Sequence, residues 1–111
     1  MRRKNYKGRC EKKDLSKCKE VVRTYNPIQA VYAEMLQKDK NVKEFKCNVP
    51  LDGLEYTSDF VCTKKDGKLM VRECVYSQHI KKPMTQKLLC MSAEYWANHG
   101  VTDWGVVINE E

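Results

Sequence analysis

The stretch LEYTSDFVCTKKDGKLMVRECVY, residues 54–76, decides the fold of this chain. It contains two runs rich in β-branched and aromatic residues, 54–63 and 68–76, on either side of a short polar loop with a glycine. Such a pattern is typical of a β-hairpin. We therefore predict two antiparallel strands here, with Asp59 in the first and Glu73 in the second.

The length of the loop decides whether these two carboxylates meet. A two-residue turn would place Asp59 opposite Cys74, whereas a three-residue loop with Gly67 in the left-handed conformation places Asp59 opposite Glu73. We predict the second register. The two Cβ atoms then lie roughly 5 Å apart, where like charges repel unless a cation or a proton intervenes. The pair is therefore a candidate functional site, and the alternative is two ordinary polar residues on a hairpin.

The segments around the hairpin predict the remaining elements of an α/β domain. A first helix begins after Asn26 as N-cap, with Pro27 at its first position. Its apolar residues recur at helical spacing and are Ile28, Val31, Tyr32, Met35 and Leu36. The run 42–49 alternates as a strand, and a second helix extends from Pro83 toward Gly100.

The last run, 102–109, is predicted to be a buried strand, and the second helix supplies the crossover to a parallel neighbour. Leu88, Met91, Ser92 and Tyr95, flanked by Leu89 and Trp96, form the face of that helix expected to pack on the sheet. The predicted order is α-β-β-β-α-β with a mixed sheet.

The positive charge of the chain is concentrated at its start. Residues 1–23 hold ten Lys or Arg against three acids, +7, while the whole chain carries +6. We predict a partly disordered basic arm, 1–23, before a domain of residues 24–111. Such an arm attracts a phosphate backbone, and the alternative is a solubilising extension. The residues expected to contact nucleic acid are Arg2, Arg3, Lys4, Lys7, Arg9, Lys12 and Lys13.

Length and composition narrow the class of protein. The 111 residues suffice for one domain, and no apolar run reaches the roughly 20 residues of a membrane helix. The start of the chain lacks the apolar segment of a signal peptide, so we expect a cytoplasmic location and no membrane partner.

The six cysteines form no CxxC pair, which favours reduced thiols over a zinc site. Cys10 and Cys18 would be the best zinc pair.

The predicted order of elements, with an aspartate in the second strand and a glutamate in the third, resembles the core of the PD-(D/E)xK nuclease superfamily. The segments YTSDFVCTKKDGKLMVRECV, 56–75, and YWANHGVTDWGVVI, 95–108, are most similar to the N-terminal domain of TnsA-type transposon endonucleases. Phage Holliday-junction resolvases are the next most similar group. The resemblance covers about residues 24–109 and implies a restriction-endonuclease-like fold.

The resemblance also implies a site for DNA cleavage with Mg²⁺ or Mn²⁺. Asp59 and Glu73 match the two strand acids and would be the metal ligands. Gln29 stands where the family has a helix glutamate, and Val75 stands where it has a lysine. The second helix would then supply the lysine, with Lys87 the best placed and Lys81 and Lys82 as alternatives. The simpler interpretations are that Gln29 caps its own helix and that Lys87 is an exposed helix lysine.

Two main functions follow from these observations, and a third is an RNA-binding regulator that uses the basic arm. The first is a small Mg²⁺-dependent DNA endonuclease with Asp59, Glu73, Gln29 and Lys87 in its active site. The second is a nuclease-like module that binds nucleic acid or protein without cleaving. The second would act as an accessory factor of a transposon or phage, or as an inhibitor of a host nucleic-acid defence system. Nucleic acid, most simply DNA, is the expected partner, and a protein partner or a homodimer would fit either function.

Overall fold

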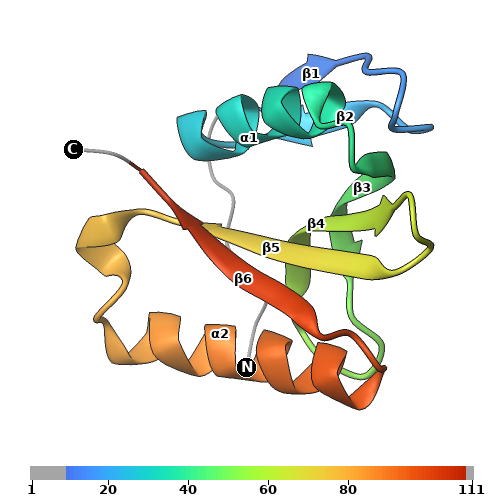
Figure 1. The fold of residues 1–111 in the computed structure, drawn as a ribbon. Helices are drawn as coiled ribbons and strands as arrows, with labels where there is room; N and C mark the ends of the chain where they lie inside the picture. Colours follow the sequence, from blue (N-terminus) through green and yellow to red (C-terminus); the bar gives the residue numbers. More distant parts are fainter. Residues whose placement is uncertain (1–9, 110–111) are drawn as a thin grey trace.

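The computed structural model describes residues 10–109 as two helices, two β-sheets and a short 3₁₀ turn (Figure 1). The order of elements is β1 (Glu11–Lys13), β2 (Val22–Thr24), α1 (Pro27–Lys38), β3 (Val42–Pro50), β4 (Thr57–Lys64), β5 (Leu69–Val75), η1 (Ser77–His79), α2 (Pro83–Asn98) and β6 (Asp103–Ile108). The predicted α-β-β-β-α-β order is confirmed from α1 to β6. The pair β1 and β2, which precedes it, was not predicted.

The main sheet has the order β3-β4-β5-β6. Strands β3, β4 and β5 are antiparallel neighbours, whereas β6 runs parallel to β5 after the crossover through α2. The mixed sheet of an α/β fold is therefore confirmed.

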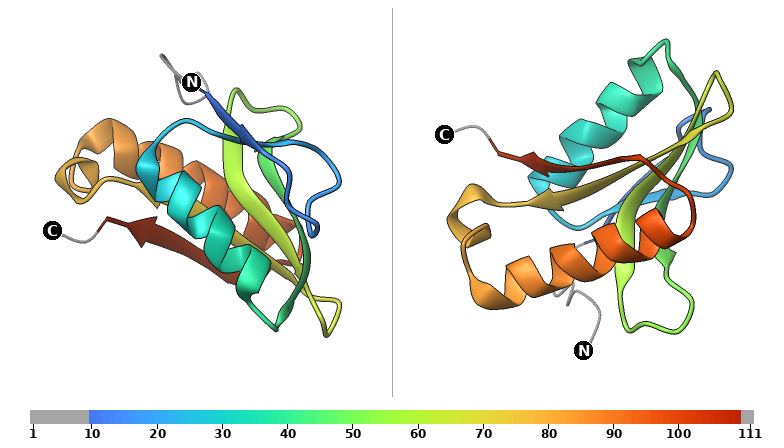
Figure 2. Two further views of the ribbon diagram at one scale, coloured as in Figure 1. Left: turned by 90° about the horizontal axis from the view of Figure 1, so that it is seen from above. Right: turned by 60° about the horizontal axis from the view of Figure 1, so that its bottom comes forward.

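The two helices cover opposite faces of this sheet (Figures 1 and 2). On the α1 face, Leu36 packs with Phe45 and Phe60 in one hydrophobic cluster. On the α2 face, Trp96 packs with Val71 in a second cluster. None of the helices within residues 10–109 has the length and apolar character needed to cross a membrane.

The β4–β5 hairpin has the predicted register. Lys64 N donates to Lys68 O at 2.9 Å, which leaves a three-residue loop, and Gly67 has φ +86°. A positive φ at this position is readily adopted by glycine and costs other residues strain. The ladder then pairs Phe60 with Arg72, so the next pair along the two strands is Asp59 and Glu73.

The start of α1 is also as predicted. The Asn26 side chain accepts a hydrogen bond from Gln29 N, and Pro27 occupies the first turn. Its apolar face differs from the prediction, because Val31 and Met35 are 62% and 58% exposed. Both side chains line a groove shared with Val107 and Ile108 of β6 instead of packing into the core.

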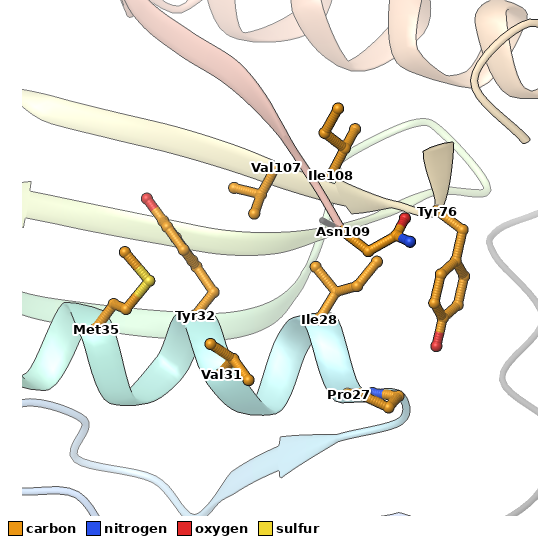
Figure 3. A pocket seen from close by; sticks show the side chains of 9 residues that line it. All are labelled: Pro27, Ile28, Val31, Tyr32, Met35, Tyr76, Val107, Ile108 and Asn109. Carbon is orange, nitrogen blue, oxygen red and sulfur yellow. The ribbon is translucent and has the colours of Figure 1, made fainter. Parts of the chain in front are cut away.

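A groove of about 410 Å³ lies between α1 and β6, and it contains the two exposed side chains (Figure 3). Figure 3 shows Tyr32 and Ile28 pointing from α1 toward Val107 of β6. Burial raises the pKa of the Tyr32 hydroxyl to about 12, so this groove carries a neutral phenol and apolar side chains.

Residues 10–23, which the sequence analysis assigned to the basic arm, are folded onto the domain. Cys18 and Val22 are buried in the cluster on the α1 face. Asn48 Nδ2 donates to Arg23 O at 2.9 Å, which ties β2 to β3. The predicted contacts at Arg2, Arg3, Lys4, Lys7 and Arg9 lie outside the described residues.

Candidate functional site

Strands β4 and β5 separate at Asp59 and Glu73. Their ladder ends at the pair of Phe60 and Arg72, although both strands continue. Beyond this point β4 pairs only with β3, and β5 pairs only with β6. The sheet therefore opens into a fork, and the backbone N–H groups along the opening need partners other than the facing strand.

Asp59 fills one side of the fork. Its side chain is 1% exposed, and its Oδ2 accepts a hydrogen bond from Cys74 N at 2.7 Å. Its Oδ1 accepts a hydrogen bond from Gln29 Nε2 at 2.8 Å. One carboxylate thus satisfies a backbone donor of β5 and fixes the start of α1 to β4.

Glu73 fills the other side and is fully buried. Its Oε1 accepts from Asp59 N at 2.9 Å, the reciprocal of the bond between Asp59 and Cys74 N. Its Oε2 accepts from two hydroxyls, Ser58 Oγ at 2.7 Å and Ser92 Oγ at 2.6 Å. The two carboxylates therefore take the place of ladder bonds where the strands part.

Two indole groups continue this network into the second core cluster. Trp96 Nε1 donates to Ser58 Oγ, and Trp104 Nε1 donates to Ser92 Oγ, each at 3.0 Å. Each serine accepts from a tryptophan and donates to Glu73. Hydrogen bonds in such chains polarise and strengthen one another in a low-dielectric interior.

Gln29 has a fixed amide orientation. Its Oε1 accepts from Tyr25 N at 2.7 Å, and its Nε2 donates to Asp59. Rotating the amide by a half-turn would set its NH₂ against the Tyr25 N–H, donor against donor, and remove the bond to Asp59. The side chain therefore binds the backbone one residue before the N-cap Asn26, close to the capping bond that the simpler interpretation expects, and also contacts the candidate site.

The described arrangement does not fit a divalent cation. Mg²⁺ and Mn²⁺ bind to oxygen ligands, yet Gln29 presents a donor group to Asp59. The oxygens of Asp59 and Glu73 accept hydrogen bonds from backbone and hydroxyl donors. Within residues 10–109, no group of three or more His, Cys, Asp and Glu side chains is placed to hold a metal ion.

The remaining predicted site residues lie apart from the fork contacts. Lys87, Lys81 and Lys82 are exposed on or just before α2, whereas it is Ser92 of that helix that reaches Glu73. Val75 is 8% exposed and belongs to the buried interior. Of the arm residues within the described part, Lys12 is exposed and Lys13 pairs with Glu34.

Sequence reasoning missed the role of both serines and of Trp104. One signal was present, since Ser92 and Trp96 stand four residues apart on the predicted buried face of α2. A small polar residue on a buried helix face must find a hydrogen-bond partner, and a buried acid on the facing strand is one.

A separate ion-pair cluster lies at the start of β6. Asp103 contacts Arg72 Nη2 at 2.7 Å and Lys64 Nζ at 3.0 Å. These hydrogen bonds hold the pKa of the Asp103 carboxyl below its usual value. The Arg72 side chain lies across Gly105, where an added Cβ would meet Arg72 atoms at 3.4–3.5 Å. This cluster anchors β6 to β5 and β4.

The sequence was compared with models of known protein families and with curated proteins. It matches no family model and no curated protein. The function therefore has to be argued from the fork and from the charge of the chain.

Proposed function

We propose that this chain is a nucleic-acid-binding module with a nuclease-like fold, in which the paired acids stabilise the sheet instead of holding a catalytic metal ion. The observation that carries the proposal is the direction of the Gln29 amide. Its NH₂ points at Asp59 because its oxygen is held by Tyr25 N. A residue that binds a metal ion here would need one oxygen for Tyr25 N and a second oxygen facing Asp59.

Charge supports the binding half of the proposal. Residues 1–23 carry +7 and the rest of the chain −1. In the described part of this segment, Lys12 and Arg23 lie opposite each other across the β1–β2 pair, and both are exposed. A dense cationic segment of this kind binds phosphate backbones without reading sequence. An accessory factor of a mobile element or phage is the role that suits such a module.

Metal-dependent DNA cleavage is the second candidate, favoured by one observation. Asp59 and Glu73 are neighbours across the fork, and one accepts a hydrogen bond from the backbone of the other. Cleavage would require the Gln29 amide to rotate and a lysine to approach from α2. The rotation would break the hydrogen bonds of Gln29 to Tyr25 N and Asp59, and the approach of the lysine would move an exposed side chain inward.

Fluorescence anisotropy with labelled duplex, single-stranded and branched DNA and with RNA tests the binding. We expect the affinity to fall steeply with salt, by up to about 0.9 in log K per log salt for each phosphate contact. A variant with Arg2, Arg3, Lys4, Lys7 and Arg9 replaced by glutamine should lose most of this salt dependence. The matched control removes the same charge from exposed lysines elsewhere and replaces Lys38, Lys40, Lys65, Lys68 and Lys81. Equal losses in both variants would show that only net charge matters and would overturn the arm as the contact.

Incubation of the same substrates with Mg²⁺ or Mn²⁺ tests the absence of cleavage. The proposal expects intact substrates. Cleavage by the natural chain that Glu73→Gln abolishes, in a variant whose unfolding transition remains cooperative, would establish the endonuclease instead.

A further inference from the structure

Cys18 and Cys47 come from separate elements and line one cavity. Cys18 lies in the loop between β1 and β2 and is 8% exposed, whereas Cys47 is half-buried on β3. The cavity has a volume of about 260 Å³ and is lined also by Phe45 and by charged residues. Phe45 N donates to Lys17 O at 3.0 Å, so the loop that carries Cys18 is held beside β3.

The two thiols differ in exposure. Both are reduced, and Cys47 packs against the hydrophobic cluster that contains Cys18. Burial raises the pKa of the Cys18 thiol, and the neighbouring Cys47 thiol adds to the rise. Cys18 is therefore held as a protonated thiol, and the more accessible Cys47 is the one that a reagent in the cavity meets first.

The rim of the cavity carries both signs of charge. It is lined by three exposed residues, Lys19, Lys46 and Glu20, and by half-buried Glu44. These four charges sum to zero, so the rim offers contacts to both the carboxylate and the ammonium groups of a reagent. A small peptide disulfide carries carboxylate and ammonium groups, which match both signs of charge at this rim.

We infer that Cys18 and Cys47 form a redox-active dithiol site that glutathione disulfide converts to an intramolecular disulfide. The Cys47 thiolate attacks one sulfur of glutathione disulfide, forms a mixed disulfide and releases one glutathione thiolate, which takes up a proton. Cys18 then loses its proton and attacks the Cys47 sulfur, which releases a second glutathione. Two protein thiols are oxidised, and one glutathione disulfide is reduced to two glutathiones.

This bond would restrain the segment that positions Gln29. The chain continues from Cys18 through β2 to Tyr25, whose N–H holds the Gln29 amide oxygen. A covalent link from residue 18 to β3 limits the movement of this segment relative to the sheet. Oxidation should therefore tighten the start of α1, independently of whether the chain binds nucleic acid.

Mass spectrometry of the full chain after incubation in glutathione buffers of increasing oxidised fraction tests the site. We expect the loss of two hydrogens per chain and a digest that contains a peptide linking residues 18 and 47. Cys18→Ser should stop at the glutathione adduct on Cys47, and Cys47→Ser should form no disulfide at Cys18. Cys90→Ser is the matched control, because Cys90 is exposed on α2 and lies outside this cavity, and it should oxidise like the natural chain.

Two physical readouts accompany the chemistry. Closing a loop of about 30 residues should raise the thermal midpoint by roughly 10 °C in the natural chain and in Cys90→Ser. The Tyr25 amide should also exchange its hydrogen more slowly after oxidation. The inference is overturned if Cys90 takes up glutathione while no peptide linking residues 18 and 47 forms. It is also overturned if oxidation raises the thermal midpoint of the Cys47→Ser chain as much as that of the natural chain.

Discussion

Replacing Gln29 by glutamate tests the reasoning about the fork most directly. The glutamate keeps an oxygen for the Tyr25 N–H and sets a second oxygen where the amide nitrogen now stands, 2.8 Å from Asp59 Oδ1. The hydrogen bond to a charged acceptor is lost, at about 1.5–3 kcal/mol. Two charged oxygens at that separation would also repel by roughly 6 kcal/mol at an effective dielectric constant of 20.

Taking up a proton limits this destabilisation. Protonating a carboxyl of ordinary pKa at pH 7 costs about 4 kcal/mol, which is less than the repulsion that it removes. We therefore expect Gln29→Glu to lose up to about 4 kcal/mol of unfolding free energy at pH 7. The shared proton raises a carboxyl pKa in the folded state, so the deficit should shrink by about 1.4 kcal/mol for each pH unit below 7, until the ordinary carboxyl pKa is reached.

A divalent cation relieves the same repulsion without a proton. Millimolar Mn²⁺ should stabilise Gln29→Glu and leave the natural chain unchanged, because only the variant sets a second carboxylate against Asp59 Oδ1. Urea titrations followed by tryptophan fluorescence, from pH 5 to 8 and with or without Mn²⁺, measure both effects. Gln29→Ala is the control, since it loses the hydrogen bond but should respond to neither pH nor metal. The reasoning fails if the natural chain gains as much stability from Mn²⁺ as the variant, or if the variant's deficit is the same at every pH.

Four further outcomes follow from contacts in the structure. Asp59→Asn should lose about 1–3 kcal/mol in urea unfolding, because two donors face its two oxygens and an amide must turn its NH₂ toward one of them. Glu73→Gln should lose less unfolding free energy than Asp59→Asn, because the hydroxyls of Ser58 and Ser92 can rotate and accept hydrogen bonds from the new NH₂ group. Equal losses in the two variants would contradict the hydrogen-bond assignment. Because the pKa of Asp103 is lower in the folded state than in the unfolded state, the ionised carboxylate stabilises the fold at any pH above the unfolded-state pKa. This contribution should disappear as the pH falls through the folded-state pKa. The urea midpoint of Asp103→Asn should therefore change less between pH 5 and pH 3 than that of the natural chain. Burial raises the pKa of Cys62 to about 12, so at pH 8 iodoacetamide should label exposed Cys90 in minutes and Cys62 only after unfolding, as read by peptide mass spectrometry.

Local sequence signals predicted most of the fold. The cap at Asn26 and Pro27, the glycine of the hairpin loop and the helix before the last strand each depend on a few adjacent residues, and all are observed. The three-residue loop fixed the register that brings Asp59 and Glu73 together. Neither β1 nor β2 was predicted, because each has only three residues and both are surrounded by lysines that suggested an extended arm.

The candidate site was predicted only in part, because its chemistry depends on contacts between distant segments. The chain showed the two acids and the amide at position 29. It did not show that Tyr25 N would fix the direction of that amide, nor that Ser58 and Ser92 would both reach Glu73. The apolar face of α1 was predicted too broad for a similar reason, because the helical spacing of Val31 and Met35 does not show whether a distant segment covers them.

Positions 29 and 75 differ in how easily each could accept the glutamate or lysine of the proposed nuclease resemblance. At position 29, two oxygens in place of one oxygen and one nitrogen keep the shape of the side chain and its bond to Tyr25 N. At position 75, the valine is 8% exposed, and a lysine would bring a charge into the interior unless its long side chain reached solvent. Gln29→Glu alone should therefore create a site that binds a cation but does not cleave DNA. Adding Val75→Lys should cost further stability, and cleavage by Gln29→Glu alone would show that the buried valine does not limit activity.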